Sequence, residues 1–287
     1  MKQIQAVILK NEKIGSGFFR MRIASSYLAK ESKPGQFVEV RCAGETEPLL
    51  RRPLGIHRIV KGGIELLYEA VGKGTGLLSE MKKGEMADLI GPLGNGFDIP
   101  SRAGAAILVA GGNGVAPLLA LAEQLLAGLP VSRFAGLQVF IGACTKDHIL
   151  CAKEFKKIGC KVLVATEDGS QGYKGLVTDL LKKELSNRHT GTPAHRHTIY
   201  ACGPAGMLKA VSEIAHDNHI PCQVSLEERM ACGVGVCLGC PVRVLVGQRV
   251  SGLAGLPAHP RTRAPANYTY KMVCKDGPVF DAAEIAW

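Results

Sequence analysis

The chain has 287 residues, 46% of them hydrophobic, and a formal net charge of +10. A chain of this length and apolar content can form two or three globular domains. It contains no run of eighteen apolar residues, which a membrane-spanning helix would need. Its lysines and arginines are spread among acids without a basic run, so the sequence predicts neither a nucleic-acid-binding nor a membrane protein.

Residues 1–100 predict an antiparallel β-barrel. Polar and apolar residues alternate in several short segments of this region, and glycine or proline pairs separate them. The alternating segments are residues 18–23, 36–40 and 64–70. Short strands at regular spacing with such turns are typical of a barrel.

Residues 101–226 predict a domain of a different type, with alternating strands and helices. Continuous apolar segments, expected as strands, are residues 105–110, 137–143, 160–166, 197–202 and 221–226. Helices are expected between them, in residues 116–127, 148–158, 176–185 and 205–216. Apolar strands joined by helices indicate a parallel α/β sheet covered on both faces. A surface connection is expected at residues 186–196.

Residues 227–287 carry four cysteines in an informative spacing. Cys232, Cys237 and Cys240 form a C-x4-C-x2-C motif, and Cys274 arrives from further along the chain. This is the thiolate arrangement of a plant-type [2Fe–2S] centre, with three ligands on one loop and one from elsewhere. The sequence therefore predicts a small iron–sulfur module that moves single electrons.

The loop that carries the first three cysteines is rich in glycine. Gly233, Gly235 and Gly239 are expected to adopt positive φ angles and to let the backbone approach a cluster closely. The stretch 251–267 is rich in proline, glycine and alanine, and it is expected as an exposed or mobile loop.

Two other interpretations of the four cysteines stay open. Zinc also takes four thiolates, but its ligands more often come as two C-x2-4-C pairs. Disulfides suit secreted chains, and the sequence shows no signal peptide. Six further cysteines are expected as buried residues or free thiols of a reducing cytoplasm: Cys42, Cys144, Cys151, Cys160, Cys202 and Cys222.

Two motifs in the barrel region suit a flavin dinucleotide. Arg52 precedes Pro53 in RRPLGIHR, where a guanidinium on a rigid strand edge can bind a pyrophosphate. Gly74 and Thr75 lie in GKGTGLLSEM, where the start of a helix offers free N–H groups to a phosphate. Each signal is weak alone, because Arg-Pro is common on barrel strands and a plain capped helix explains the second motif.

Two further motifs follow strands of the expected sheet, where open α/β sheets bind ligands. AGGNGVAPL, residues 110–118, places a glycine turn after the first parallel strand, although it lacks the G-x-G-x-x-G fingerprint. YACGPAGM, residues 200–207, leaves room at Cys202 and Gly203 for a flat ring. An ordinary strand-to-helix turn is the alternative for this last motif.

The order of these motifs is more specific than any one of them. Together with LEERMACGVGVCLGC and CKDGPVFDAAEIAW, it resembles the electron-transfer subunits of NAD-linked dihydroorotate dehydrogenases, in the ferredoxin–NADP reductase superfamily. The resemblance covers nearly the whole chain. It implies a FAD-binding antiparallel β-barrel over residues 1–100, a NAD-binding parallel α/β domain over residues 101–226 and a [2Fe–2S] module over residues 227–287.

The resemblance also implies which residues hold each group. For FAD they are Arg52, Pro53, Leu54, Gly55, Leu67, Tyr68, Glu69, Gly74 and Thr75. For NAD they are Gly111, Gly112, Asn113, Gly114, Cys202, Gly203 and Pro204. For the cluster they are Cys232, Cys237, Cys240 and Cys274. No catalytic side chain is expected, because the cofactors carry the chemistry.

The implied partner is an FMN-containing dihydroorotate dehydrogenase catalytic subunit. The two chains would form a cytoplasmic heterotetramer in de novo pyrimidine (UMP) synthesis, with electrons passing from FMN through [2Fe–2S] and FAD to NAD+. NAD is favoured over NADP because the turn at residues 142–144 offers no arginine pair for a 2′-phosphate, although Lys146 lies close by.

Two features depart from the family pattern. Gly55 stands where Ser or Thr is usual, so a backbone N–H would have to serve the flavin, and the gap between Cys240 and Cys274 is long. One alternative function is an electron-transfer flavoprotein subunit of a ferredoxin-linked NAD(P)H oxidoreductase or hydrogenase. Relatives of that kind usually have Asp at the position of Cys232. The other alternative is a redox- or zinc-binding regulatory module.

Overall fold

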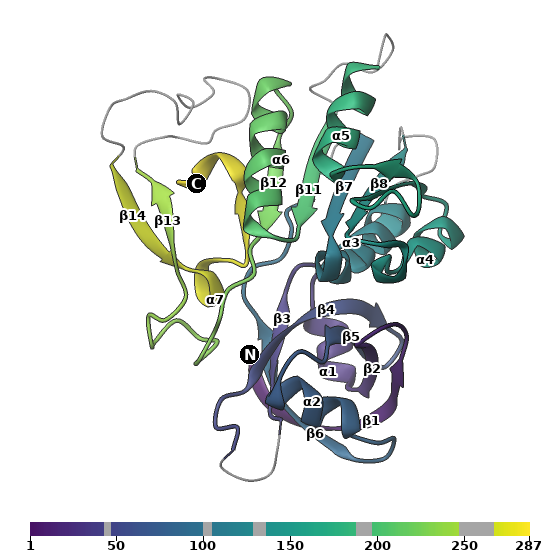
Figure 1. Cartoon of the computed structure of the whole chain (residues 1–287). Coiled ribbons are helices and arrows are strands. Elements are labelled where there is room, and N and C mark those ends of the chain that lie inside the picture. Colours follow the sequence, from purple (N-terminus) through teal and green to yellow (C-terminus); the bar gives the residue numbers. More distant parts are fainter. Residues whose placement is uncertain (43–46, 100–104, 129–135, 188–196, 247–266) are drawn as a thin grey trace.

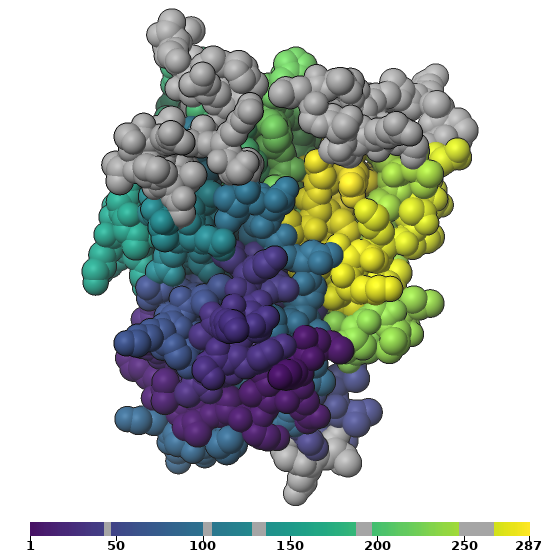
Figure 2. All heavy atoms as spheres, turned by 180° about the vertical axis from the view of Figure 1, so that it is seen from behind, coloured from purple at the N-terminus to yellow at the C-terminus, as the bar shows by residue number. Residues whose placement is uncertain are grey.

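The computed structural model describes residues 1–42, 47–99, 105–128, 136–187, 197–246 and 267–287. Figure 1 shows an N-terminal barrel, a sheet flanked by helices and a C-terminal ribbon beside that sheet. Seen from behind in Figure 2, the C-terminal part, in light green and yellow, lies next to both the sheet domain and the barrel. Within the described residues, no helix is long and apolar enough to cross a membrane.

The barrel is closed and antiparallel, as predicted, with the strand order β1-β2-β5-β4-β3-β6. Its strands are β1 (Lys2–Lys13), β2 (Phe18–Ala24), β3 (Phe37–Val40), β4 (Arg52–Val60), β5 (Gly63–Glu69) and β6 (Met86–Leu93). Two helices belong to it, α1 (Ser26–Glu31) and α2 (Lys73–Glu80). Alternate residues of the strands, such as Ile8, Met21 and Ile64, fill its core.

The second region is a seven-stranded sheet in the order β10-β9-β8-β7-β11-β12-β15. Its parallel strands are β7 (Ala105–Gly111), β8 (Leu137–Ala143), β9 (Lys161–Thr166), β10 (Tyr173–Lys174), β11 (His197–Cys202) and β12 (Cys222–Ser225). Four helices connect them: α3 (Val115–Gly128), α4 (Ala152–Lys157), α5 (Val177–Ser186) and α6 (Ala205–Asp217). The predicted α/β fold is confirmed.

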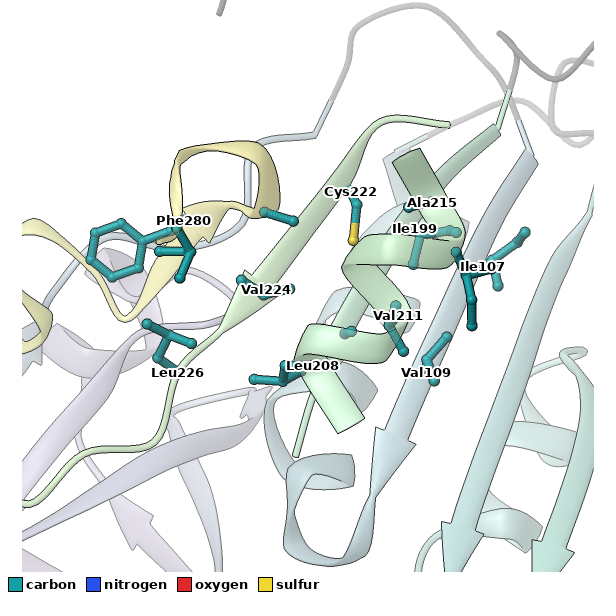
Figure 3. Packing of buried hydrophobic residues seen from close by; sticks show 14 of the residues in the cluster. Ile107, Val109, Ile199, Leu208, Val211, Ala215, Cys222, Val224, Leu226 and Phe280 are labelled. Carbon is teal, nitrogen blue, oxygen red and sulfur yellow. The ribbon is translucent and has the colours of Figure 1, made fainter. Parts of the chain in front are cut away.

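Helices cover both faces of this sheet, and the strands divide their side chains between the two. Ile107 and Val109 of β7 join one hydrophobic cluster with α5 and α6, whereas Leu108 joins another with α3 and α4. Figure 3 shows α6 lying over the strands, with Leu208 and Val211 among the residues of the first cluster. Burial on both faces explains why these strands are continuously apolar.

One predicted helix is shorter than expected. The sequence predicts a helix over residues 148–158, but α4 begins only at Ala152. Residues Lys146–His148 form a separate 3-10 turn, η3. The reason is Cys151, which adopts a left-handed conformation with φ of 59° and so interrupts helical geometry.

The C-terminal part begins with an irregular loop after β12. It continues through the hairpin β13 (Pro241–Leu245) and β14 (Tyr268–Met272), helix α7 (Val273–Asp276), strand β15 (Val279–Asp281) and the turn η5 (Ala282–Glu284). Strand β15 pairs antiparallel with β12, so the chain end joins the edge of the sheet. The domain limits proposed from the sequence stay predictions. Residues 188–196 of the expected surface connection and 251–266 of the expected loop lie outside the described residues.

Candidate functional site

A cavity of about 1070 Å³ lies where the barrel, the sheet and the C-terminal part meet. Strand β4 and the start of α2 form its barrel side. The start of α3 and the end of β11 form its sheet side, and the segment after β12 closes it. The lining residues used below are Arg52, Pro53, Leu54, Gly55, Leu67, Gly74, Thr75, Asn113, Ala116, Pro117, Cys202, Ser225, Glu227, Met230 and Gly239.

The barrel side offers positive charge beside a helix N-terminus. Gly74 lets Arg52 lie against the first turn of α2, since a Cβ at Gly74 would be 2.6 Å from Arg52 Nε. The hydroxyl of Thr75 accepts a hydrogen bond from the backbone N–H of Val71 at 3.0 Å and caps the helix. A guanidinium next to the positive end of a helix is a favourable place for a phosphate group.

The structure brings seven of the nine residues predicted for FAD to the cavity wall: Arg52, Pro53, Leu54, Gly55, Leu67, Gly74 and Thr75. Tyr68 and Glu69 do not line it. The Tyr68 hydroxyl donates to Asn11 Oδ1 at 3.0 Å inside the barrel, and burial raises its pKa to about 12. Side chains alternate along β5, so Leu67 faces the cavity and Tyr68 faces the barrel core.

Gly55 leaves open space in the cavity wall. A Cβ placed there would meet no atom within 4 Å. The site would therefore accept the Ser or Thr that is usual at this position in the family pattern. The glycine is thus not required by packing, and any donor at this point of the wall has to come from the backbone.

On the sheet side, the two predicted glycine turns pack against each other. Strands β7 and β11 are neighbours, and Ala110 pairs with Cys202. A Cβ on Gly114 would collide with the carbonyl oxygen of Cys202, which explains the glycine. Asn113 and Cys202 line the cavity, and Asn113 Oδ1 has no hydrogen-bond partner among the described residues. The other five residues predicted for NAD do not line the cavity: Gly111, Gly112, Gly114, Gly203 and Pro204.

Sequence reasoning missed the segment after β12. Ser225, Glu227 and Met230 contribute to the cavity, and Ser225 is buried there. The signal was available: polar residues directly after the last parallel strand lie at the ligand-binding edge of such sheets.

The four predicted cysteine ligands come together in the structure as two neighbouring pairs. The Cys237 thiol donates to the Cys232 sulfur, and the Cys274 thiol donates to the Cys240 sulfur. The backbone N–H of Gly235 donates to Cys274 Sγ at 3.1 Å and so links the pairs. No group of three or more His, Cys, Asp or Glu among the described residues is arranged to hold one metal ion.

Cys232 and Cys274, one from each pair, differ in proton affinity. Burial alone would raise the pKa of Cys232, but backbone N–H groups and the Cys237 thiol outweigh it and bring that pKa to about 6. Burial and the neighbouring Cys240 raise the pKa of Cys274 to about 12. Backbone donors to sulfur favour the thiolate form, which is the form that binds iron.

Backbone conformation in the cysteine loop follows the prediction at two of three glycines. Gly233 and Gly235 have φ of 68° and 82°. Gly239 has no positive φ; instead Leu238 takes the left-handed conformation, at 56°. The side chains of Val236 and Leu238 are 76% and 65% exposed on either side of the exposed Cys237. The tip of the loop is therefore apolar and accessible.

A buried carboxyl separates this loop from the barrel. Glu39 of β3 is 1% exposed, and neither of its oxygens has a hydrogen-bond partner among the described residues. A Cβ on Gly233 would lie 2.6 Å from Glu39 Cγ, so the loop backbone packs on this side chain. Burial raises the pKa of Glu39 to about 7, against the opposing influence of Arg51. No motif in the sequence predicts this contact.

Known proteins share both the domains and the overall fold. Residues 108–213 match an oxidoreductase NAD-binding domain, and residues 227–252 match the iron–sulfur cluster binding domain of dihydroorotate dehydrogenase B. A solved NADH-dependent reduced ferredoxin–NADP oxidoreductase, a flavin-based electron-bifurcating enzyme, superposes with a TM-score of 0.76 and 32% identity over 98% of this chain and 90% of that one. A ferredoxin–NADP+ reductase from Neisseria gonorrhoeae, 18% identical, shares the fold over 76% of this chain and 92% of its own, with a TM-score of 0.63.

The barrel, the nucleotide sheet and the cysteine loop therefore define an iron–sulfur oxidoreductase of the ferredoxin–NADP reductase type. A dihydroorotate dehydrogenase B (NAD(+)) electron transfer subunit of Desulforamulus reducens is 36% identical over 100% of this chain and 99% of its own length. The same subunit of a Geobacillus species is 38% identical over 99% of both chains. The chain belongs to the family of dihydroorotate dehydrogenase B electron transfer subunits, and the predicted iron–sulfur cofactor is confirmed. The assignment of the four cysteines as its ligands stays a prediction.

Proposed function

We propose that this chain carries electrons between the catalytic subunit of a dihydroorotate dehydrogenase and NAD+. One observation carries the proposal: a single cavity is lined by the barrel at Gly55, by the nucleotide sheet at Asn113 and by the cysteine loop at Gly239. The residue after Gly239 is the predicted ligand Cys240. Sites for a flavin, a nicotinamide and an iron–sulfur cluster are thus adjacent.

The barrel side fits FAD. Arg52 and the N-terminus of α2 suit a pyrophosphate, and β4 from Pro53 to Gly55 offers a flat wall with free space for a ring. FAD bound there would supply the conversion between a two-electron hydride and single electrons. The protein itself would bind and orient the cofactors and set the distances between them, because none of the described lining residues is needed as a general base.

The cysteine loop fits a [2Fe–2S] cluster, with Cys232, Cys237, Cys240 and Cys274 as ligands. Two pairs of thiols suit two irons that each take two thiolates. The backbone N–H of Val234 donates to Cys232 Sγ, and that of Cys274 donates to Cys240 Sγ, each at 3.4 Å. Such donors stabilise negative charge on sulfur.

The sheet side fits a dinucleotide across Gly111–Gly114 and Cys202–Pro204, and we propose NAD in preference to NADP. The Cys144 thiol donates to Glu167 Oε1 at 3.5 Å, which places the carboxylate of the turn after β9 beside the turn after β8. Asp168 follows in the same turn. Negative charge here would repel a 2′-phosphate and can accept a hydrogen bond from a ribose hydroxyl.

The partner we propose is an FMN-containing catalytic subunit in a heterotetramer that serves pyrimidine synthesis in the cytoplasm. The relatives are named electron transfer subunits, which implies a catalytic partner. The exposed apolar tip formed by Val236 and Leu238 beside Cys237 is a suitable approach for it. None of the ten cysteines, all of which lie among the described residues, forms a disulfide, which suits a reducing compartment.

A second candidate is a subunit that passes electrons to or from ferredoxin. It is favoured by the likeness to the NADH-dependent reduced ferredoxin–NADP oxidoreductase. The full-length curated relatives and Cys232 as first ligand favour the main proposal. The two differ in the partner that accepts or donates the single electrons.

The test combines the purified chain with a dihydroorotate dehydrogenase catalytic subunit. NADH should bleach the flavin absorbance of the chain alone, and NADPH should do so far more slowly. Dihydroorotate should then reduce NAD+ only when both subunits are present. Exchange with ferredoxin but not with the catalytic subunit would favour the second candidate, and no bleaching by NADH would contradict both.

A further inference from the structure

A buried histidine lies just behind the cavity wall and has no part in the proposed electron path. His57 of β4 follows Gly55 by two residues and is fully buried. The register of β4 against β5 shifts between Ile56 and Arg58, so His57 is the extra residue of a β-bulge. A bulge turns a side chain out of the regular alternation, and here it directs His57 away from the barrel core and onto α3.

Both ring nitrogens of His57 have a partner. Nδ1 lies 2.9 Å from the carbonyl oxygen of Ala116, which can only accept, so Nδ1 carries the proton. Nε2 is then the acceptor and faces the thiol of Cys151 at 3.9 Å. Burial raises the pKa of Cys151 to about 12, so its S–H remains available to donate. The ring is neutral, in one tautomer and in one orientation.

The hydrogen bond from His57 joins the two walls that would carry the two rings. Strand β4 lines the cavity from Arg52 to Gly55, and α3 lines it at Ala116 and Pro117, close to Asn113. The bond therefore runs directly behind the point where the barrel wall faces the nicotinamide side.

Two ion pairs cross the same interface further from the cavity. Arg58 Nε donates to Glu123 Oε1 at 2.9 Å, about two helical turns along α3 from Ala116. Arg20 contacts Glu154 of α4 at 3.3 Å. These pairs hold the same two domains together without touching a cavity residue. A substitution in one of these pairs should therefore weaken the association of the domains without moving the cavity walls, and it can serve as a control.

We propose that His57 is a positioning residue for hydride transfer, which fixes the spacing between the flavin wall and the nicotinamide wall. The inference rests on the proposed function. In the transfer, two electrons and one proton move together between the nicotinamide and flavin rings, as one C–H bond breaks and one N–H bond forms. His57 gives and takes no proton. It holds the walls at a spacing on which such a transfer depends steeply.

The experiment uses the FAD- and cluster-loaded chain with His57→Leu, which removes both hydrogen bonds but keeps an apolar filling. His57→Gln keeps an N–H donor, and Glu123→Gln is the matched control at the same interface. We would measure the rate constant of flavin reduction at saturating NADH, the long-wavelength charge-transfer absorbance of the NADH–flavin complex and the thermal unfolding midpoint.

His57→Leu should lower the rate constant about tenfold and weaken the charge-transfer band, while FAD stays bound. His57→Gln should recover most of both signals, and Glu123→Gln should lower only the unfolding midpoint. A wild-type rate and band in His57→Leu would overturn the proposal, and so would an equal loss in Glu123→Gln.

A further variant keeps the test valid if His57→Leu does not fold. In Cys151→Ala the donor to Nε2 is gone and the orientation of the ring is less fixed, so both signals should decrease to a smaller extent. No decrease would count against the proposal. Failure of NADH to reduce the wild-type flavin at all would instead contradict the proposed function and is therefore a distinguishable result.

Discussion

The barrel makes two interfaces, and they are built in opposite ways. Toward α3 and α4 it presents His57, Arg58 and Arg20, each of which has a polar partner across the boundary. Toward the cysteine loop it presents Glu39, which is buried with no hydrogen-bond partner among the described residues. There the contact depends on the close approach of a glycine backbone at Gly233.

The difference matches what each interface would have to do. Hydride transfer needs the two rings in near contact and in one orientation, so directional bonds at the first interface are an advantage. A single electron can cross intervening protein, and its transfer depends on potential as well as on placement. A buried carboxyl beside the cysteine loop acts on the electrostatics of that loop.

The largest effect is expected when one predicted cluster ligand in the cysteine loop is replaced. Cys240→Ser should remove nearly all iron and acid-labile sulfide while FAD remains bound, because the barrel site is separate from the thiols. Metal analysis and the flavin spectrum of anaerobically purified protein measure both. The buried Cys160, far from the loop in sequence, provides the control, and Cys160→Ala should keep its iron. Loss of iron in the control or full iron in Cys240→Ser would contradict the assignment.

Acid should destabilise the first interface through His57. Burial lowers its pKa to about 4, below the 6.5 of an unfolded histidine, so the unfolded chain binds the proton more tightly. The corresponding stability, about 3 kcal/mol, is present above pH 6.5 and is lost as the pH falls toward 4. Unfolding midpoints between pH 7 and pH 4 test this: the wild type should lose more stability than His57→Leu. Parallel pH profiles of the two proteins would be evidence against it.

Glu39 should produce the opposite pH dependence at the second interface. Its pKa of about 7 lies above the 4.5 of an unfolded glutamate, so the folded chain binds the proton more tightly. The wild type should therefore lose about 3 kcal/mol as the pH rises from 4.5 through 7. Glu39→Gln removes this loss, and thermal unfolding at pH 8 should show a more stable protein. A Gln variant less stable than the wild type at pH 8 would mean that the carboxylate has a partner in solution.

The smallest effect concerns the glycine approach. Gly233 and Gly62 have similar φ angles, 68° and 76°, so an alanine at either carries about 1–2 kcal/mol of backbone strain. Only at Gly233 does the new methyl group meet a neighbour, at 2.6 Å from Glu39 Cγ; at Gly62 it meets nothing within 4 Å. Gly233→Ala should be less stable than Gly62→Ala by about 1 kcal/mol and should hold less iron. Equal midpoints and equal iron would show that the loop does not pack on Glu39.

The secondary structure and the order of the domains could be predicted from the sequence because both depend on residues that are close together in the chain. Alternating residues predicted the barrel, apolar segments predicted the parallel sheet, and the order of the motifs predicted the family. The structure confirms the fold, and the relatives confirm the family. Seven of the nine FAD residues reach the cavity for the same reason, because neighbouring motifs lie on neighbouring elements.

The features that were not predicted depend on contacts between distant segments. No motif indicated that the side chain of Tyr68 lies in the barrel core, and its place along the flavin edge stays a prediction. The late start of α4 follows from the left-handed Cys151, which contacts His57 on another domain. Glu39 carries no motif, and its importance appears only where the cysteine loop packs against it. The importance of these residues cannot be judged from the sequence, because their contacts form only in the folded protein.

The most direct test of the whole account is an elemental and spectroscopic measurement on anaerobically purified protein. The account predicts two irons, two acid-labile sulfides and one FAD per chain, with an EPR signal of a reduced [2Fe–2S] centre after addition of NADH. Protein that contains no acid-labile sulfide and gives no EPR signal even after dithionite would contradict it.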